Sequence, residues 1–287
     1  MMYDVMIIGA GPAGISASLY AKRANKNVLV LYYGTSEEEK AHKIDNYYGF
    51  VGGIEGKELY NHGIQQAKQL GIEVLEQEVI NIAMNADKSF TIQTTEGAFQ
   101  GATVILATGN KKVRPNIKGI ATFEGKGVSY CAICDGFFYK GKTVAVLGNG
   151  EYAMSEANDL KNVVESVAIL TDGQEAPNTE TYEVNTKKIK EVQGEGKLQS
   201  IIFDDGTTMV VEGLFIAQGI AGGSNFAKKM GIKTNPDDSI VVGDNMETNI
   251  PGIYACGNVT GGLLQVSKAV YEGATAGLAA VNYVNKK

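Results

Sequence analysis

The chain has 287 residues, of which 44% are hydrophobic and 20% charged, and a formal net charge of −6 at pH 7. This length is enough for two domains of ordinary size, and the composition is typical of a globular protein. The negative charge argues against nucleic acid as a partner. No stretch reaches the roughly 18 apolar residues of a membrane span, so no membrane partner is expected either.

The N-terminal region predicts a dinucleotide-binding unit. Residues 3–8 form a short apolar run that predicts a buried strand, and Gly-Ala-Gly-Pro-Ala-Gly follows at residues 9–14. Residues 15–21 then have helical spacing. Strand, glycine turn and helix in this order are typical of dinucleotide binding, because the glycines let the backbone approach a pyrophosphate and the helix N-terminus faces its charge.

One element of this pattern is missing. The second predicted strand, residues 27–31, is followed by Tyr32, Tyr33 and Gly34 and not by the carboxylate that usually accepts ribose hydroxyls. Three glutamates occupy residues 37–39. Because they form a run of charges, we interpret them as a solvated turn.

The most informative motif is the C-x-x-C sequence of Cys131 and Cys134, followed by Asp135. Such a motif indicates a redox dithiol, half of a zinc site, or chance. Structural zinc needs four ligands, mostly Cys and His, and the chain has only three Cys and two His. A redox dithiol needs only two thiols that can form a disulfide, so we expect redox chemistry and no metal site.

A second nucleotide-type turn follows the dithiol. Residues 143–147 predict a strand, and Gly-Asn-Gly-Glu-Tyr-Ala at residues 148–153 leads into a helical stretch. Further strand-and-turn signals lie at residues 104–109 and 248–259. Two glycine turns about 140 residues apart predict two dinucleotide-type subdomains.

Together these motifs resemble the low-molecular-weight thioredoxin reductases, essentially from end to end. Residues 127–139 around the two cysteines are the most specific part of the resemblance. It implies an α/β fold of two Rossmann-like, FAD/NAD(P)-binding-type domains, the second inserted into the first, and a homodimer. We expect an FAD-binding domain of residues 1–113 and 241–287 and an inserted domain of residues 114–240.

The resemblance implies a flavin-dependent disulfide oxidoreductase that reduces thioredoxin. In that role Cys134 faces the flavin and Cys131 attacks the disulfide of thioredoxin. Asp135 is the nearby acid that exchanges protons with the thiols, and it could also cap a turn or helix. Phe137, Phe138 and Tyr139 are candidates either for docking thioredoxin or for core packing.

The resemblance also implies FAD as cofactor and a set of residues that contact it. These are Gly9, Gly11, Pro12, Ala13, Gly14, Asn46, Ala107, Thr108, Gly109, Gly257, Asn258, Gln265 and Val266. Asn258 stands where the family usually has an aspartate that contacts the ribityl chain, but an amide can also bond there. Gln265 and Val266 fall at the expected edge of the flavin ring. The third cysteine, Cys256, is expected to be a small buried thiol.

The sequence argues against NADPH as electron donor. Relatives that use NADPH follow the second strand of the inserted domain with an arginine-rich cluster that binds the 2′-phosphate. Here residues 166–170 predict that strand, and Thr-Asp-Gly-Gln follows. The chain has only two arginines, Arg23 and Arg114, and neither lies within residues 115–240. Bidentate recognition of a phosphate is therefore not possible there.

Two other donors stay open. In one hypothesis Asp172 accepts the ribose 2′-hydroxyl of NADH, for which the retained turn at Gly148 is the main support. In the other, electrons come from reduced ferredoxin. The chain is similar to the ferredoxin-dependent flavin thioredoxin reductases of anaerobic bacteria, which are short and lack the arginine cluster. Residues 219–226, which replace the usual Gly-x-x-Pro-Asn-Thr, also favour ferredoxin.

A ferredoxin is usually acidic, so docking would require a local basic face on this acidic chain. Candidates for that face are Lys22, Arg23, Lys26, Lys40, Lys43, Lys111, Lys112 and Arg114. A flavoprotein relay for a dedicated partner other than thioredoxin is an alternative of a different class. We expect a cytoplasmic location, because a working dithiol suits a reducing compartment and the chain begins without a secretion signal.

Overall fold

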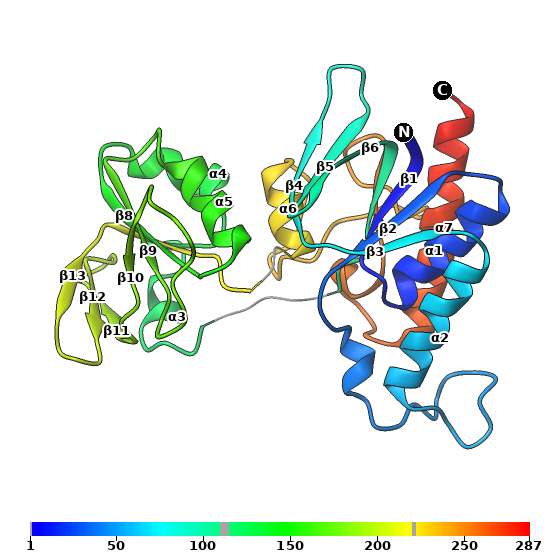
Figure 1. The fold of residues 1–287 in the computed structure, drawn as a ribbon, viewed down its shortest axis with the longest axis horizontal. Helices are drawn as coiled ribbons and strands as arrows, with labels where there is room; N and C mark the ends of the chain where they lie inside the picture. The colour runs from blue at the N-terminus through cyan, green and yellow to red at the C-terminus, as the bar shows by residue number, and fades with distance from the viewer. Residues whose placement is uncertain (1, 110–114, 220–221) are drawn as a thin grey trace. The chain divides into compact units, whose positions relative to one another are not determined.

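The structure is a computed structural model that describes residues 2–109, 115–219 and 222–287 (Figure 1). The chain divides into two compact units. The discontinuous unit comprises Met1–Lys111 and Gly222–Lys287, and the inserted unit comprises Lys112–Ala221. Within the described ranges, no helix combines the length and the hydrophobicity that crossing a membrane requires.

The discontinuous unit is built on a mainly parallel sheet. Over the described residues this sheet has seven strands, in the order β3-β2-β1-β6-β5-β4, with β15 also paired to β6. The strands are β1 (Met2–Ile8), β2 (Val28–Tyr32), β3 (Glu73–Glu76), β4 (Val79–Met84), β5 (Phe90–Thr94), β6 (Gly97–Leu106) and β15 (Ile253–Ala255). Parallel pairing joins β3, β2, β1, β6 and β15, so the ends of these strands meet along one edge of the sheet.

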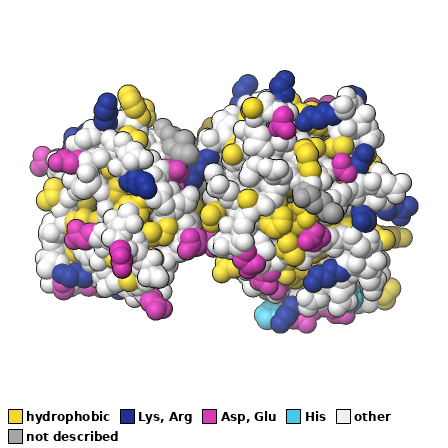
Figure 2. Space-filling view, turned by 45° about the horizontal axis from the view of Figure 1, so that its top comes forward, with side chains coloured by type: hydrophobic (Ala, Val, Ile, Leu, Met, Phe, Trp, Pro, Cys, Tyr) yellow, Lys and Arg dark blue, Asp and Glu magenta, His cyan; other side chains and the backbone are white. Residues whose placement is uncertain are grey.

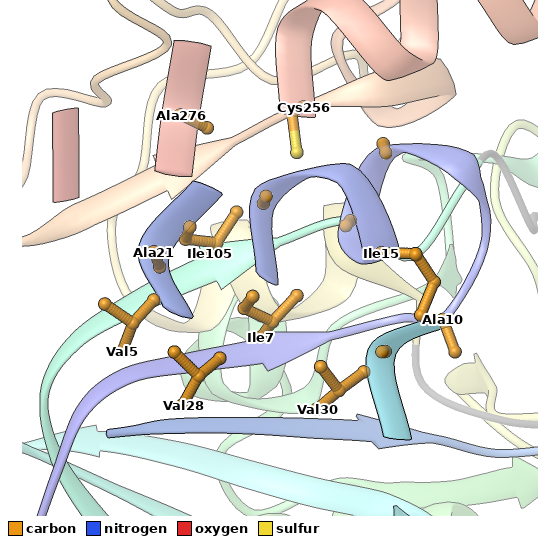
Figure 3. Close-up of a cluster of buried hydrophobic side chains, with 14 of the residues drawn as sticks. Val5, Ile7, Ala10, Ile15, Ala21, Val28, Val30, Ile105, Cys256 and Ala276 are labelled. Carbon is orange, nitrogen blue, oxygen red and sulfur yellow. The ribbon is translucent and has the colours of Figure 1, made fainter. Parts of the chain in front are cut away.

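Helix α1 is packed between this sheet and the last helix of the chain. The helices of the unit are α1 (Pro12–Arg23), η1 (Glu37–Lys40), α2 (Gly56–Gln69), α6 (Gly223–Lys229), η3 (Gly257–Thr260) and α7 (Val266–Asn285). Figure 3 shows Val5, Ile7 and Val28 of the strands on one side of α1, and Cys256 and Ala276 on the other. Because both sides of α1 are buried, its sequence is dominated by small side chains.

Two glycines of α7 allow its backbone to approach α1 closely. A Cβ on Gly273 would lie 2.1 Å from the carbonyl oxygen of Ala13, and a Cβ on Gly277 would lie 2.5 Å from that of Ala17. Neither position can hold a larger residue unless the helices separate. The C-terminal helix is thereby fixed against the glycine-turn helix.

The inserted unit contains a second parallel sheet and a smaller antiparallel one. Over the described residues the first has five strands in the order β10-β9-β8-β14-β7, and the second has three in the order β11-β12-β13. The strands are β7 (Val128–Ser129), β8 (Thr143–Leu147), β9 (Ser166–Leu170), β10 (Glu183–Asn185), β11 (Ile189–Gln193), β12 (Ser200–Phe203), β13 (Thr208–Val210) and β14 (Gly213–Ile216). The helices are α3 (Ile120–Phe123), α4 (Ala132–Asp135), η2 (Gly136–Tyr139) and α5 (Glu151–Leu160). The predicted α/β class and both strand–turn–helix units, β1–α1 and β8–α5, are confirmed.

The compact discontinuous unit resumes earlier than the boundary at residue 241 that the sequence suggested. Residues 222–240 belong to it because their backbone is bonded to its C-terminal part. The amide of Ile240 donates to the carbonyl of Val259 at 2.8 Å, and the amide of Lys233 donates to the side chain of Asn249 at 2.8 Å. No local sequence pattern indicates that the chain returns to the discontinuous unit at residue 222.

Replacing Gly277 tests the close approach of α7 to α1. We expect Gly277→Val to destabilise the fold by about 1–3 kcal/mol, because the added methyl groups would overlap the backbone of Ala17. The control is Thr275→Val, whose side chain bonds only the Tyr271 carbonyl of its own helix. It should change stability by about 0.5 kcal/mol or less. Equal unfolding midpoints in urea for the two variants would contradict the packing argument.

Candidate active site

The first glycine turn forms a closely packed cradle at the start of α1. A Cβ on Gly9, whose φ is +114°, would lie 2.2 Å from the carbonyl oxygen of Ala107, and one on Gly14 would lie 1.9 Å from that of Gly9. These two glycines are needed for close packing. A Cβ on Gly11 would lie 3.1 Å from Ser36 Oγ and 3.7 Å from Glu38 Oε2, so any side chain there would crowd the loop that follows β2. Free backbone amides at such a terminus suit a pyrophosphate.

Segments far apart in the sequence meet beside this cradle. The amide of Cys256 donates to the carbonyl of Leu106 at 3.0 Å, which brings Gly257 and Asn258 next to the end of β6, where Ala107, Thr108 and Gly109 follow. Gly257 has a φ of +81°, and a Cβ there would lie 2.8 Å from the Cβ of Ala13. All the predicted cofactor contacts of these segments therefore lie at the carboxyl edge of the parallel strands, the usual place for a ligand in such sheets.

A buried ion pair, which the sequence analysis missed, holds the turn at η3. Glu272 Oε2 accepts from the amide of Gly257 at 2.8 Å and from the hydroxyl of Thr260 at 3.0 Å. Lys268 Nζ lies 3.1 Å from that same oxygen and donates to the carbonyl of Gly257 at 3.0 Å. The spacing of four residues between Lys268 and Glu272 could have predicted their ion pair on one helix. The sequence could not predict that this pair binds the backbone of η3, because the tertiary fold brings η3 to it.

Asn46 and Gln265, two predicted contacts of the cofactor, are brought together. Asn46 Nδ2 donates to Gln265 Oε1 at 2.9 Å, and both side chains are exposed. Val266 is the first residue of α7, directly after Gln265. The structure thus joins a loop after β2 to the start of the last helix.

Glu38 does not behave as part of a solvated turn, which corrects the interpretation of residues 37–39. Glu37 is exposed, but Glu38 is half-buried and its carboxylate bonds to the hydroxyl of Ser36. The carboxylate lies 3.7 Å from the Cβ position of Gly11, and burial raises the pKa of Glu38. A carboxylate placed here, after β2 and beside the glycine turn, suits ribose hydroxyls. The sequence analysis did not identify Glu38 as a ribose ligand because this residue lies six positions after the end of β2.

The predicted dithiol lies at the start of α4 in the inserted unit. Cys131 is disulfide-bonded and 3% exposed; the backbone of Cys134 is in α4, but its side chain lies outside what the structure describes. Ser129 Oγ donates to Asp135 Oδ2 at 2.6 Å and accepts from the amide of Cys131 at 3.1 Å. Asp135 is therefore connected to Cys131 through one hydroxyl group.

Cys256 is confirmed as a buried free thiol. It is fully enclosed in the core of the discontinuous unit, and burial raises its pKa well above the usual value. A thiol of this kind is unreactive at neutral pH. It takes no part in the dithiol chemistry.

The second glycine turn is built like the first. A Cβ on Gly148 would lie 2.2 Å from the carbonyl oxygen of Ala217, as one on Gly9 would from that of Ala107, and a Cβ on Gly150 would meet its nearest atom, the carbonyl oxygen of Gly219, at 4.0 Å. Asp172, the predicted ribose ligand of NADH, has φ +51°, and its Oδ1 accepts from the amide of Ile189 at 2.8 Å. Its carboxylate is thus engaged in fixing the start of β11. The first turn of α5 adds the negative charge of Glu151.

Of the candidates for the basic face, the structure describes the side chains of Lys22, Arg23, Lys26 and Lys43. Lys22 and Arg23 lie in the last turn of α1, at the opposite end of that helix from Gly11, and Lys26 donates to Asn285 at 2.5 Å. Lys43 is exposed and lies 3.7 Å from Asp45. Lys111, Lys112, Arg114 and the side chain of Lys40 lie outside the described part of the chain. Figure 2 shows Lys and Arg interspersed with Asp and Glu on the face drawn.

The family model described as pyridine nucleotide-disulphide oxidoreductase matches residues 3–273. The chain belongs to this family. The thioredoxin reductase of Helicobacter pylori is 34% identical over 309 residues, covering 99% of both chains. The crystal structure of the atypical thioredoxin reductase TRi from Desulfovibrio vulgaris Hildenborough matches with a TM-score of 0.90 and 39% identity, covering 99% of this chain and 98% of that one.

The name of a third relative states an electron donor, ferredoxin. The ferredoxin-flavin thioredoxin reductase of Clostridium acetobutylicum matches with a TM-score of 0.71 and 32% identity, over 100% of this chain and 99% of that one. The family match and the similarity to these thioredoxin reductases show that the protein is a flavin disulfide oxidoreductase of the thioredoxin reductase type, and that its cofactor is FAD. The residues fit that cofactor, because the glycine turn at the start of α1 suits a pyrophosphate and the carboxylate of Glu38 lies beside it.

Glu38→Gln tests whether the missed carboxylate contributes to FAD binding. The change keeps the shape but removes the charge that strengthens an accepted hydrogen bond, so we expect the FAD dissociation constant to rise about tenfold. Flavin fluorescence on dilution measures it. Glu37→Gln, an exposed neighbour, is the matched control and should bind FAD as the unmodified protein does. Equal affinity for all three proteins would exclude Glu38 as a ribose ligand.

Proposed function

We propose that this thioredoxin reductase takes its electrons from reduced ferredoxin and passes them through FAD to the dithiol of Cys131 and Cys134, and from there to thioredoxin. The observation that carries the choice of donor is the lack of any arginine within residues 115–240, which leaves no bidentate partner for a phosphate. One oxygen of Asp172 accepts from the amide of Ile189, so only its other oxygen is left for a ribose hydroxyl.

The charge of the inserted unit supports the same choice. Residues 151–200 carry ten acidic side chains and five lysines, and no arginine lies within residues 115–240. Glu151 stands in the first turn of α5, where a phosphate would otherwise meet the positive end of the helix. Both the 2′-phosphate of NADPH and the pyrophosphate of NADH would be repelled. The similarity to a ferredoxin-flavin thioredoxin reductase agrees with a protein donor.

The residues around the dithiol suit disulfide exchange. Bound FAD supplies the two electrons that reduce the disulfide, and two protons are taken up to give two thiols. Asp135 is the proposed acid that exchanges one of these protons, and the hydroxyl of Ser129 donates to its carboxylate. Cys131 then attacks the disulfide of thioredoxin as a thiolate and forms a mixed disulfide with it. Cys134 next attacks the sulfur of Cys131, which restores the disulfide of the enzyme and releases reduced thioredoxin.

Cys131 must be uncovered before it can attack. Its exposed fraction is 3% in the disulfide form, so the disulfide of a partner protein cannot reach its sulfur directly. A rearrangement that exposes the C-x-x-C segment is therefore part of the proposed cycle. The cycle also places the protein in a reducing compartment such as the cytoplasm, and by family resemblance in a homodimer.

An aromatic surface next to the dithiol is proposed as the thioredoxin docking site. Phe137 and Phe138 are 74% and 69% exposed, which is unusual for phenylalanine. Tyr139 instead packs against Phe215, with ring centroids 5.3 Å apart. Of the three aromatic residues, the two phenylalanines are thus available to a partner and the tyrosine belongs to the core.

The donor can be tested by an anaerobic titration of the flavin absorbance. We expect reduced ferredoxin to bleach the flavin band, at four electrons for each FAD because the disulfide takes two of them, and NADH and NADPH to leave it unchanged over the same time. Asp172→Asn should not alter the reaction with ferredoxin. Rapid bleaching by NADH that Asp172→Asn weakens would overturn the proposal and make the inserted unit a working nucleotide site.

The docking surface can be tested by steady-state kinetics with thioredoxin. Phe137→Ala and Phe138→Ala should each raise the KM for thioredoxin about tenfold, because each removes a large apolar contact. Flavin reduction by the donor should stay the same. Val210→Ala is a matched control, since Val210 is 74% exposed in the same unit. An unchanged KM in both phenylalanine variants would exclude this surface.

A further inference from the structure

A short helix carries the two exposed phenylalanines that follow the dithiol. Helix η2 is a 3-10 helix of four residues that begins directly after α4, and Phe137 and Phe138 on it are 74% and 69% exposed. A single turn of 3-10 helix is not stable in isolation. The conformation in which it presents its side chains must therefore be fixed by contacts with the rest of the inserted unit.

The ring of Tyr139 packs the end of η2 into the core. It lies edge-on to the ring of Phe215, at an angle of 75° and with the centroids 5.3 Å apart, and Phe215 is 1% exposed. A Cβ on Gly213 would lie 2.6 Å from Cε1 and 2.8 Å from Cδ1 of Tyr139. The ring therefore occupies the space that any side chain at this position of β14 would fill. The glycine is needed for this approach and not for its backbone, because its φ is not positive.

Lys142 binds the end of η2 from a position directly before β8. Its Nζ donates to the carbonyl of Phe138 at 3.0 Å and lies 5.5 Å from the centroid of the Tyr139 ring. Its amide donates to the carbonyl of Tyr139 at 3.0 Å, and its carbonyl accepts from the amide of Glu165 at 3.0 Å. A lysine that binds one of the last carbonyls of a helix and faces an aromatic ring stabilises that helix end through both contacts.

The segment from the dithiol to β8 is thus connected to its surroundings at both ends. At the start, Oε2 of Glu156 accepts from the amide of Ala132 at 2.6 Å, which joins α4 to α5. At the end, Tyr139 and Lys142 join η2 to β14 and to the start of β8. Between them lie the two phenylalanines, and neighbouring exposed side chains of this size mark an interaction site. A surface that keeps its shape without a partner loses little conformational entropy on binding.

We propose that Tyr139 and Lys142, together the anchor of η2, are positioning residues that preset Phe137 and Phe138 for thioredoxin. The proposal rests on the proposed function in taking these two phenylalanines as the docking surface. Because the anchor fixes η2 before the partner arrives, thioredoxin binds without having to order it. The anchor should then act on the affinity for thioredoxin and not on the chemistry of the flavin or the dithiol.

Gly213→Ala tests the anchor at a buried position that thioredoxin cannot touch. The added methyl group would displace the ring of Tyr139 and leaves both phenylalanines and both cysteines in the sequence. We expect the KM for thioredoxin to rise about fivefold, because only a fraction of the molecules would then present the docking surface correctly. The kcat and the rate of flavin reduction by the donor should change by less than about twofold. Gly63→Ala, where a Cβ would meet nothing closer than 3.6 Å, is the control and should keep the original KM.

A series of variants at Lys142 tests the second residue of the anchor. Lys142→Met removes the donor and the charge and should raise the KM about threefold, and Lys142→Arg, which retains both, should restore it. Lys140→Met removes the same charge from an exposed neighbour and should leave the KM unchanged. In a protein that already carries Phe137→Ala and Phe138→Ala, Lys142→Met should have no further effect, because the side chains that it positions are gone.

The outcomes separate the anchor from the docking surface. If Gly213→Ala and Lys142→Met fold and keep the original KM while both phenylalanine variants raise it, the surface stands and the anchor is refuted. A rise in KM that Lys142→Met causes equally with and without the two phenylalanines also overturns the inference, because Lys142 would then contact thioredoxin itself. Should Gly213→Ala fail to fold, the Lys142 series decides. An unchanged KM in the phenylalanine variants would refute the docking surface of the proposed function, and the anchor with it.

Discussion

The discontinuous unit depends on the close approach of three backbones. The turn before α1 lies against the carbonyl of Ala107 through Gly9, and α7 lies against α1 through Gly273 and Gly277. Larger side chains at these positions would separate the layers by the width of a methyl group or more. Because the layers are this close, the ends of β1, β6 and β15 meet around the N-terminus of α1. That meeting point is the cofactor cradle.

Carboxylates that bond backbone amides shape the rest of the chemistry. Glu272 holds the amide of Gly257 beside the cradle, Glu156 holds the amide of Ala132 beside the dithiol, and Asp172 holds the amide of Ile189 beside the second glycine turn. In the first two cases the carboxylate positions a functional segment. In the third, one oxygen of Asp172 fixes the start of β11.

The parts of the active site that local motifs encode were predictable. The turn of residues 9–14 and the C-x-x-C of Cys131 and Cys134 each combine residue types and spacing that few other structures require, and the surrounding strands and helices followed from hydrophobic periodicity. Glu38 and Glu156 were not found. Each is one glutamate among many, and its role comes from a neighbour that is distant in the sequence or lies on another helix.

The sequence by itself determined the α/β class, the two glycine turns, the dithiol and the absence of an arginine cluster, since these depend on residue identity and short spacing. Only the tertiary structure decided that residues 222–240 pack with the discontinuous unit, that Lys22 and Arg23 lie away from the cradle, and that the carboxylate of Asp172 is engaged. These features depend on which segments meet in space. Such meetings are set by the packing of whole layers, and no short stretch of sequence carries that information.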